Sequence, residues 1–309
     1  MKKLRVAVLG AGRIGKYHVR ELFSLGSEVV AILGSTKESS SKTAGELNKE
    51  FGVNARPYYV LEELLRNEDL DAVSVCTPPK LHEYQMRMCL ENDLHIMCEK
   101  PFIQAENDGY SKAEGLFDLA EKKGKTLTVN TQWASIADYF RIYGFLNDLR
   151  EFSVSMQPEK KGIDMLRDHL PHANSVLIKI IPKGEADKIR FLLKNDEAIS
   201  LGFKYKNSEK ACEVKYGFES RKTRPGQIVF SLNEKTFKRE IGPNYRQSFV
   251  SDDGRCRFEI EDPLRVSIRR FLEDCSGSGS ALVNKEEILG NMLLSEQIIQ
   301  NYTSDFHKP

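Results

Sequence analysis

The stretch LRVAVLGAGRIGKYHVRELF, residues 4–23, decides the fold of the first part of this chain. It opens with a short apolar run ending in glycine, which is typical of a central parallel strand covered on both faces. The hexapeptide Gly10-Ala11-Gly12-Arg13-Ile14-Gly15 follows, and the amphipathic pattern after it predicts a helix through Phe23. A G-x-G-x-x-G motif between a strand and a helix predicts a dinucleotide site, because glycines let the backbone approach a pyrophosphate and the helix N-terminus offers N–H groups to it.

Strands and helices continue to alternate up to residue 130. The expected strands are EVVAIL (28–33), ARPYYV (55–60), DAVSVC (71–76), LHIMC (94–98) and TLTVN (126–130). Helical patterns lie between them, and such alternation predicts a doubly wound parallel sheet. We therefore expect a Rossmann dinucleotide-binding domain over residues 1–130, with its ligand at the carboxyl ends of the strands.

The pentapeptide CEKPF, residues 98–102, places two opposite charges and a proline directly after an apolar run. A lysine there can be the first solvated residue of a loop. However, Lys100 falls at the edge of the sheet where dinucleotides bind, which favours a functional role. The residues expected at this part of the cofactor crevice are Thr77, Pro78, Pro79, His82, Glu99 and Lys100.

The end of the second strand bears on the choice between NAD and NADP. An enzyme that prefers NAD usually has an acidic residue there to bind the ribose hydroxyls. This chain has Ser35, Thr36 and Lys37, and no acid before Glu38. Two hydroxyls and a cation can hold the 2′-phosphate of NADP by charge-assisted hydrogen bonds. We expect NADP(H) to be favoured over NAD(H); the alternative is that Ser35 and Thr36 only cap the next helix.

From about residue 150 the pattern changes to short alternating or apolar runs. They are FSVSMQ, KIRFLL, AISLGFKY, ACEVKYGFE, QIVFSL, KTFKREI and CRFEI. This pattern predicts an α+β domain over residues 131–309 with a large, mostly antiparallel open sheet. One face of that sheet should pack on helices. The other face should be an apolar surface that meets its copy in a homodimer or homotetramer.

Composition excludes several classes of protein. The 309 residues are 40% hydrophobic and 29% charged with a net charge of +1, which is typical of a globular protein without affinity for nucleic acid or membrane surfaces. No apolar run approaches the roughly 20 residues of a membrane span, and the glycines at 10–15 come too early for a signal peptide. Six cysteines without metal-ligand spacing indicate free thiols. We expect a cytoplasmic protein without a metal site.

The stretches GAGRIG, TPP followed by His82, and above all CEKP make the chain resemble the Gfo/Idh/MocA oxidoreductases. The resemblance covers the whole chain. Residues 261–299 resemble the family's closing pair of helices, of which the C-terminal helix is expected to return toward the nucleotide domain. The resemblance implies that Lys100 lies near the nicotinamide and the substrate.

A second family element is an Asp-x-Gly-x-His segment at the start of a helix. Here Asp168 and His172 match its ends, and Leu170 replaces the glycine. Because proline is tolerated only in the first turn of a helix, Pro171 predicts a helix that begins at about Asp168. Both side chains would then share one face at the helix N-terminus. Ser175 stands where many relatives carry an aspartate, so an acidic partner for His172 is missing there.

The resemblance implies an NAD(P)-dependent oxidoreductase that transfers a hydride between nicotinamide and a secondary alcohol or ketone of a sugar-like or cyclic small molecule. Lys100 and His172 would handle the proton, and Asp168 would position the substrate or the lysine. Three alternatives stay open: reduction of a C=N bond, hydrolysis with a recycled dinucleotide, and a non-catalytic dinucleotide-binding sensor. A sensor has no need to keep the three residues together.

Other residues have less specific readings. Trp133, the only tryptophan, can line the substrate site or pack in the core. His18 and His95 are interpreted as structural. A group of basic residues can favour an anionic substrate or simply form a solvated face: Lys160, Lys161, Arg167, Arg221, Lys222 and Arg224.

Overall fold

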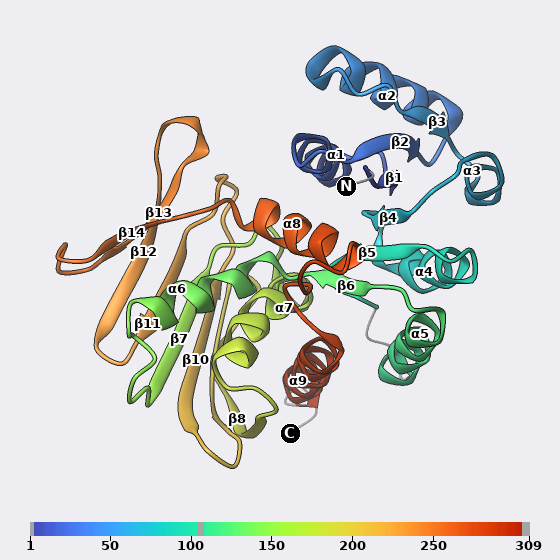
Figure 1. The fold of residues 1–309 in the computed structure, drawn as a ribbon. Coiled ribbons are helices and arrows are strands. Elements are labelled where there is room, and N and C mark those ends of the chain that lie inside the picture. Colours follow the sequence, from blue (N-terminus) through green and yellow to red (C-terminus); the bar gives the residue numbers. More distant parts are fainter. Residues whose placement is uncertain (1–2, 104–107, 305–309) are drawn as a thin grey trace. The chain divides into compact units, whose positions relative to one another are not determined.

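The computed structural model describes residues 3–103 and 108–304, which form two compact units (Figure 1). The first unit comprises the chain up to Thr131 together with Leu264–Lys285. The second comprises Gln132–Pro263 and the chain from Glu286 onward. The chain therefore leaves the first unit after its last parallel strand and comes back to it for one helix.

The first unit is built on a six-stranded parallel sheet with the order β3-β2-β1-β4-β5-β6 (Figure 1). Its strands are β1 (Arg5–Leu9), β2 (Glu28–Leu33), β3 (Arg56–Tyr58), β4 (Ala72–Val75), β5 (His95–Glu99) and β6 (Leu127–Asn130). This is the strand order of dinucleotide-binding folds, and it reverses direction between β1 and β4. The carboxyl ends of β1, β4 and β5 therefore border the place where such sheets bind ligands.

Helices pack on this sheet and close its core. They are α1 (Arg13–Ser24), α2 (Lys37–Phe51), α3 (Leu61–Asn67), α4 (His82–Glu91), α5 (Gly109–Lys123) and α8 (Pro263–Cys275), with a short 3-10 turn η1 (Pro79–Leu81). Ile268 and Phe271 of α8 are buried in the same core as Val6 and Val8 of β1. The helix that returns to the nucleotide-binding unit is thus α8, whereas the sequence analysis expects the final helix.

The second unit contains an eight-stranded sheet with the order β14-β13-β12-β11-β7-β10-β9-β8. Its strands are β7 (Glu151–Met156), β8 (Glu185–Lys194), β9 (Ala198–Lys206), β10 (Ala211–Glu219), β11 (Ile228–Leu232), β12 (Lys235–Ile241), β13 (Gln247–Ser251) and β14 (Arg257–Ile260). Strands β7 and β10 pair in parallel, and the other neighbours pair antiparallel. The predicted fold class, a doubly wound parallel sheet followed by a mostly antiparallel one, is confirmed.

One face of this second sheet carries the hydrophobic core of the unit. It packs on η2 (Gln132–Ser135), α6 (Ile136–Ile142), α7 (Gly162–Ile180) and α9 (Lys285–Ser304). Phe140 of α6 contacts Phe230 and Phe237 at ring distances of 5.5 and 6.1 Å, and Leu294 and Ile298 of α9 join the same cluster. The apolar side chains that alternate along the strands thus lie under the helices.

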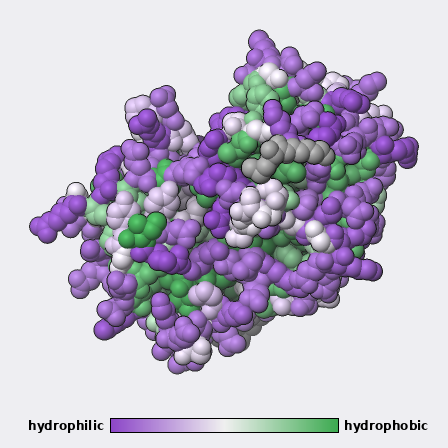
Figure 2. All heavy atoms as spheres, in the orientation of Figure 1, coloured by the Kyte–Doolittle hydropathy of each residue, from purple (hydrophilic) through white to green (hydrophobic). Residues whose placement is uncertain are grey.

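The other face of the second sheet is mainly polar, which corrects the expectation of an apolar open face. Along β9 and β10, apolar side chains point into the core, so the alternate positions, such as Ser200, Lys204 and Lys215, fall on the open side. Figure 2 draws one side of the whole molecule, not this sheet face alone, and shows mostly hydrophilic residues with scattered hydrophobic ones. Because this face is mainly polar, burial of apolar surface gives less reason for a second copy to cover it. A homodimer or homotetramer stays a prediction.

Helix α7 begins at Gly162, not at about Asp168 as the position of Pro171 predicts. A proline in a helix interior costs about 3 kcal/mol. Met165, Leu166 and Leu170 bury their side chains in the core, and each burial of this kind stabilises by about 1.5–3 kcal/mol. Because the gain exceeds the cost, the helix continues through the proline, and the two predicted residues lie in its middle.

The described residues also give information on membrane-spanning helices, disulfides and metal sites. None of the helices in residues 3–103 and 108–304 is long and apolar enough to span a bilayer. All six cysteines are free thiols. Within the same ranges, His, Cys, Asp and Glu side chains nowhere gather in a group of three or more that could hold a metal ion.

Candidate active site

The glycine turn after β1 has the geometry that a dinucleotide requires. Gly10 has a φ of +121°, and a Cβ there would lie 2.6 Å from the Cys76 carbonyl oxygen. A Cβ on Gly15 would lie 1.9 Å from the Gly10 oxygen, so packing excludes larger residues at both positions. A Cβ on Gly12, in contrast, would meet nothing within 4 Å. Gly12 therefore leaves space for a group from outside the protein, as expected where the backbone contacts a pyrophosphate.

Helix α1 presents N–H groups beside this turn. Its N-cap is Gly12, which has no side chain to bond the first backbone amides, and Arg13 and Ile14 are exposed. Uncapped amides and the positive end of the helix dipole attract anions. The predicted cofactor segment 10–15 thus fits a pyrophosphate in both shape and charge.

The junction between β2 and α2 carries the residues predicted for the ribose end of the cofactor. Thr36 is the N-cap of α2, and its Oγ1 accepts a hydrogen bond from the Ser39 amide at 3.1 Å. Thr36 thus has the capping role that the sequence analysis left as an alternative, while Ser35 and Lys37 are exposed. A backbone hydrogen bond and the Thr36 side chain lower the pKa of Glu38. The junction therefore holds a carboxylate as well as a cation.

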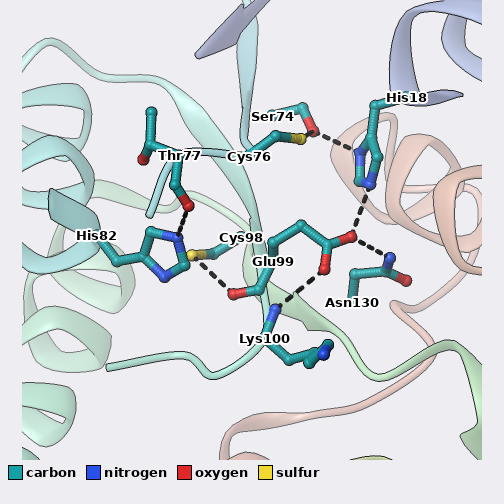
Figure 3. Close-up of polar contacts among 9 residues, drawn as sticks. All are labelled: His18, Ser74, Cys76, Thr77, His82, Cys98, Glu99, Lys100 and Asn130. Carbon is teal, nitrogen blue, oxygen red and sulfur yellow. Dashed lines mark hydrogen bonds and ion pairs between the residues drawn. The ribbon is translucent and has the colours of Figure 1, made fainter. Parts of the chain in front are cut away.

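His82 joins the loops that follow β4 and β5. Its Nε2 lies 2.8 Å from the Thr77 carbonyl oxygen (Figure 3), and its Nδ1 lies 3.0 Å from the Pro101 carbonyl oxygen. Thr77 Oγ1 also donates to Gln85 Oε1 at 2.5 Å. Because the His82 ring is fully buried, it supports the crevice by holding both loops, and its assignment to the cofactor site stays a prediction. Pro78 is exposed and Pro79 half-buried between these residues.

The glutamate of the CEKP stretch is paired with a histidine. His18 of α1 is fully buried; its Nε2 lies 2.8 Å from Glu99 Oε1 and its Nδ1 lies 2.7 Å from Ser74 Oγ (Figure 3). Burial lowers the pKa of His18, but Cys76 and Glu99 outweigh this effect and raise it to about 10. Burial raises the pKa of Glu99, but the hydrogen bond and charge of His18 outweigh it and lower the value to about 2. The two side chains form a buried ion pair at neutral pH.

This ion pair holds the backbone of Lys100. Asn130 Nδ2 donates to Glu99 Oε1 at 2.5 Å, and the Lys100 N–H donates to Glu99 Oε2 at 3.3 Å (Figure 3). Both carboxylate oxygens are thus engaged, one of them by the amide that precedes the Lys100 side chain. In Figure 3 that side chain extends away from the carboxylate. Glu99 therefore fixes where the Lys100 side chain starts, at the carboxyl end of β5.

Three members of this network are not predicted from the sequence: His18 is interpreted there as structural only, and Ser74 and Asn130 have no assigned role. A signal for His18 was present. A glutamate at the end of an apolar strand needs a hydrogen-bonding or cationic partner once it is buried. A histidine on the helix that follows the glycine turn is a natural source of that partner.

The second unit holds the other predicted catalytic residues on α7. Asp168 is half-buried and His172 is buried, four residues apart on the helix. His169, which the sequence analysis does not name, lies between them: its Nδ1 is 3.3 Å from Asp168 Oδ2, and its ring is 6.3 Å from the His172 ring. Ser175 Oγ donates to the His172 carbonyl oxygen at 2.8 Å. The serine thus bonds the helix backbone and does not replace an acid beside the imidazole.

Trp133 is packed beside this helix. Its side chain is buried, η2 packs against α7, and the ring meets Phe249 edge-on at 6.4 Å. Both readings of Trp133 from the sequence are therefore compatible with its position. The structure places Asp168, His172 and Trp133 in the second unit and Lys100 in the first, so their action on one substrate is a proposal.

The basic residues considered for an anionic substrate are largely matched by acids. Arg167 lies 3.1 Å from Asp164, and Arg221 lies 2.6 Å from Glu219. Two further ion pairs join Lys161 to Glu197 and Arg224 to Glu159. These four cations are exposed, which favours the reading of a solvated face.

Comparison with known proteins finds a family match for the first part of the chain. Residues 4–131 match the family model GFO_IDH_MocA, described as an oxidoreductase family with an NAD-binding Rossmann fold. Inositol 2-dehydrogenase 1 of Paenarthrobacter aurescens is 35% identical over 124 residues, which cover 40% of this chain and 35% of that protein. The matched segments span about a third of the length of the curated relatives.

Solved structures extend the likeness to both units. UDP-N-acetylglucosamine 3-dehydrogenase GnnA from Acidithiobacillus ferrooxidans aligns with a TM-score of 0.74 at 17% identity, covering 97% of this chain and 98% of that one. KijD10, a 3-ketoreductase from Actinomadura kijaniata in complex with NADP, aligns with a TM-score of 0.71 at 17% identity, covering 97% of both chains. At these identities the likeness establishes the fold. The family match thus concerns residues 4–131, which carry the glycine turn and the CEKP stretch, and the solved structures establish the fold of both units.

Proposed function

We propose that this protein is an NADP-dependent oxidoreductase that interconverts a secondary alcohol and a ketone on a sugar-like or cyclic small molecule. The observation that carries the proposal is the placement of Lys100. It lies at the carboxyl end of β5, and its backbone amide is held by a glutamate that a buried histidine keeps ionised. In a sheet of this strand order, that position borders the cofactor crevice.

The roles of the residues follow from their chemistry. When bound, the nicotinamide cofactor supplies or accepts the hydride. The turn at 10–15 and the start of α1 hold its pyrophosphate. The Lys100 amino group donates a proton to the carbonyl oxygen in reduction, or accepts one from the hydroxyl in oxidation. In this proposal His172 shares in the proton transfer, and Asp168 positions the substrate or the lysine.

The relatives suggest the substrate class. One curated relative is named an inositol 2-dehydrogenase and one structural neighbour a 3-ketoreductase. Both names describe oxidation or reduction at a carbon that bears oxygen. We therefore propose a cyclic polyol or a sugar ring, or the corresponding ketone, as the substrate.

A first test is a screen for hydride transfer. Purified protein is mixed with NADPH and cyclic ketones, or with NADP and cyclic polyols and sugars, and the NADPH absorbance band is followed. A matched set of cyclic imines separates C=O from C=N reduction. Turnover with a ketone or alcohol is the expected result, and turnover with imines alone would replace this proposal.

Lys100→Met tests the assigned proton carrier. Loss of a positioned acid–base group lowers the rate by about 10²- to 10⁴-fold, while NADPH affinity should change little because the pyrophosphate is held by the glycine turn. Single-turnover rates and NADPH titrations measure the two quantities. A Lys80→Met variant, which removes an exposed lysine of η1, is the matched control and should keep full activity. Near-full activity of the Lys100 variant would refute the role.

A further inference from the structure

Arg239 is a buried cation in an apolar surface. The alternation along β12 points Phe237 and Arg239 into the core side of the sheet and Lys238 and Glu240 outward. Arg239 is 9% exposed, and its partner across the ladder is Phe249. A leucine or phenylalanine would continue the pattern at this position. The chain instead places a charge there, which the packing of the sheet does not explain.

The guanidinium has hydrogen-bonding and aromatic neighbours but no acid. One terminal nitrogen donates to the Gly226 carbonyl oxygen, and the other lies 3.4 Å from Gln247 Oε1. Its central carbon lies 5.2 Å from the centroid of the Trp133 ring. In the part of the chain that the structure describes, no carboxylate lies within ion-pair distance of Arg239.

A buried charge without a counter-charge is unfavourable. Burial lowers the pKa of Arg239, and the nearby Tyr245 side chain opposes that shift. Neutral oxygens and a tryptophan face reduce the penalty but do not cancel it. Buried charges in proteins are normally paired or hold a ligand. Arg167, Arg221 and Arg224 are exposed, and each has an acid partner. Arg239 differs from them because it is buried and, among the described residues, has no acid partner.

We propose that Arg239 binds an oxyanion of the substrate, a carboxylate or a phosphate group, with Trp133 as the aromatic wall of this subsite. The guanidinium is a planar fork that matches such oxyanions with two parallel hydrogen bonds, and its two printed contacts leave N–H groups for them. Trp133 belongs to η2, which packs against α7, the helix of Asp168 and His172. Arg239 is thus a specificity-determining residue for an anionic sugar or cyclic acid. That the anion belongs to a substrate rests on the proposed function, whereas anion binding itself does not.

Trp133 gives a direct readout, since it is the only tryptophan. We would titrate the protein without cofactor with glucuronate, glucose 6-phosphate and glucose at constant ionic strength, and follow tryptophan fluorescence. A saturable change with one or both anionic probes, and a weaker one with glucose, is expected. The first two arms distinguish a carboxylate from a phosphate. No anion-specific change would overturn the proposal.

Two variants test the residue. Arg239→Met should weaken the anion response by about 10- to 100-fold, the effect of losing a hydrogen-bonded charge. Arg221→Met, which removes an exposed arginine paired with Glu219, should leave it unchanged. Arg239→Lys should retain part of the response, because it keeps the charge and loses the fork. An unchanged response in the methionine variant would refute the assignment.

Thermal unfolding separates a binding role from a structural one. If Arg239 is kept for a ligand, Arg239→Met removes an uncompensated charge, and the melting temperature of the ligand-free protein should stay the same or rise. A structural arginine would give a lower melting temperature, which would count against the proposal. If Arg239→Met does not fold, Arg239 has a structural role, and this result also contradicts the proposal. Hydride transfer is measured separately, so absence of turnover with retained anion binding would contradict the proposed function and leave this subsite intact.

Discussion

Glu99 and His18 are 81 positions apart in the sequence, yet their contact decides how Lys100 is presented. Glu99 belongs to β5 and His18 to α1, and both are removed from bulk water. In such surroundings each charge needs the other, since removing one partner of a buried pair typically costs about 3–5 kcal/mol. A residue that seems remote from the chemistry thus supports the geometry of the proposed proton carrier.

The His18–Glu99 pair predicts a pH-dependent stability. The pKa of His18 rises from 6.5 to about 10 on folding, so its contribution is fully present below pH 6.5 and is lost as the pH rises toward 10. The pKa of Glu99 falls from 4.5 to about 2, so its contribution is present above pH 4.5 and is lost as the pH falls toward 2. We expect the free energy of unfolding in urea to fall between pH 6.5 and 10. In His18→Gln this slope should be smaller, and the protein should be less stable at pH 6.

His95→Gln is the matched control for this experiment. Burial lowers the pKa of His95 from 6.5, so this histidine is neutral across the window in which His18 titrates. Its replacement should leave the slope between pH 6.5 and 10 as it is. Equal slopes in wild type and His18→Gln would mean that the pair is not charged as described.

At the scale of secondary-structure elements, we propose that the junction of β2 and α2 sets the choice between NADP and NAD. The start of α2 is capped by Thr36 and carries both Lys37 and Glu38. A cation there attracts the 2′-phosphate of NADP, whereas a carboxylate repels it and suits a ribose hydroxyl. The proposed preference for NADP therefore depends on which of the two side chains faces the ribose.

Single substitutions of Lys37 and Glu38 test the proposed NADP preference. Lys37→Ala should weaken NADPH binding and leave NADH binding nearly unchanged, because only NADPH carries the phosphate. Glu38→Gln should strengthen NADPH binding, since it removes the negative charge of a carboxyl group whose pKa is lowered. Each effect is expected at about 1.5- to 5-fold, the size of one charge contact at an exposed site. Cofactor fluorescence titrations would measure it, and NADH affinity equal to or above that of NADPH in the wild type would reject the preference.

At the scale of the whole molecule, the predicted homodimer or homotetramer remains to be tested. The open face of the second sheet carries charges of both signs, such as Lys204 directly opposite Glu213. Among the described residues, exposed leucines lie on it only at β8, where Leu193 is opposite Ser200, whereas an obligate interface is more apolar. If this face meets its copy, the contact is polar and weakens with salt. We predict a homodimer or homotetramer in light scattering at low ionic strength that dissociates at high salt. In Lys204→Glu the assembly should weaken at all salt concentrations, and a monomeric wild type at micromolar concentration would contradict the prediction.

The nucleotide-binding unit could be predicted from the sequence because its signals are local. Gly10 must adopt a positive φ, Gly15 must pack against backbone, and the alternation of apolar strands and helices is visible within short windows. The position of Lys100 at a strand end follows from the same pattern. The start of α7 could not be predicted this way, since a local rule about Pro171 competed with burial of side chains by strands that lie far away in the sequence.

Only the tertiary structure decided which partners individual side chains contact and on which face of a sheet they lie. His18 becomes part of the site because α1 packs against β4 and β5, Arg239 becomes a buried cation because of the face on which β12 turns it, and the second sheet proves polar on its open side. The physical reason is the same in each case. Desolvation and pairing depend on neighbours from distant parts of the chain, whereas the backbone conformation of a glycine turn or a strand is set largely by the residues themselves.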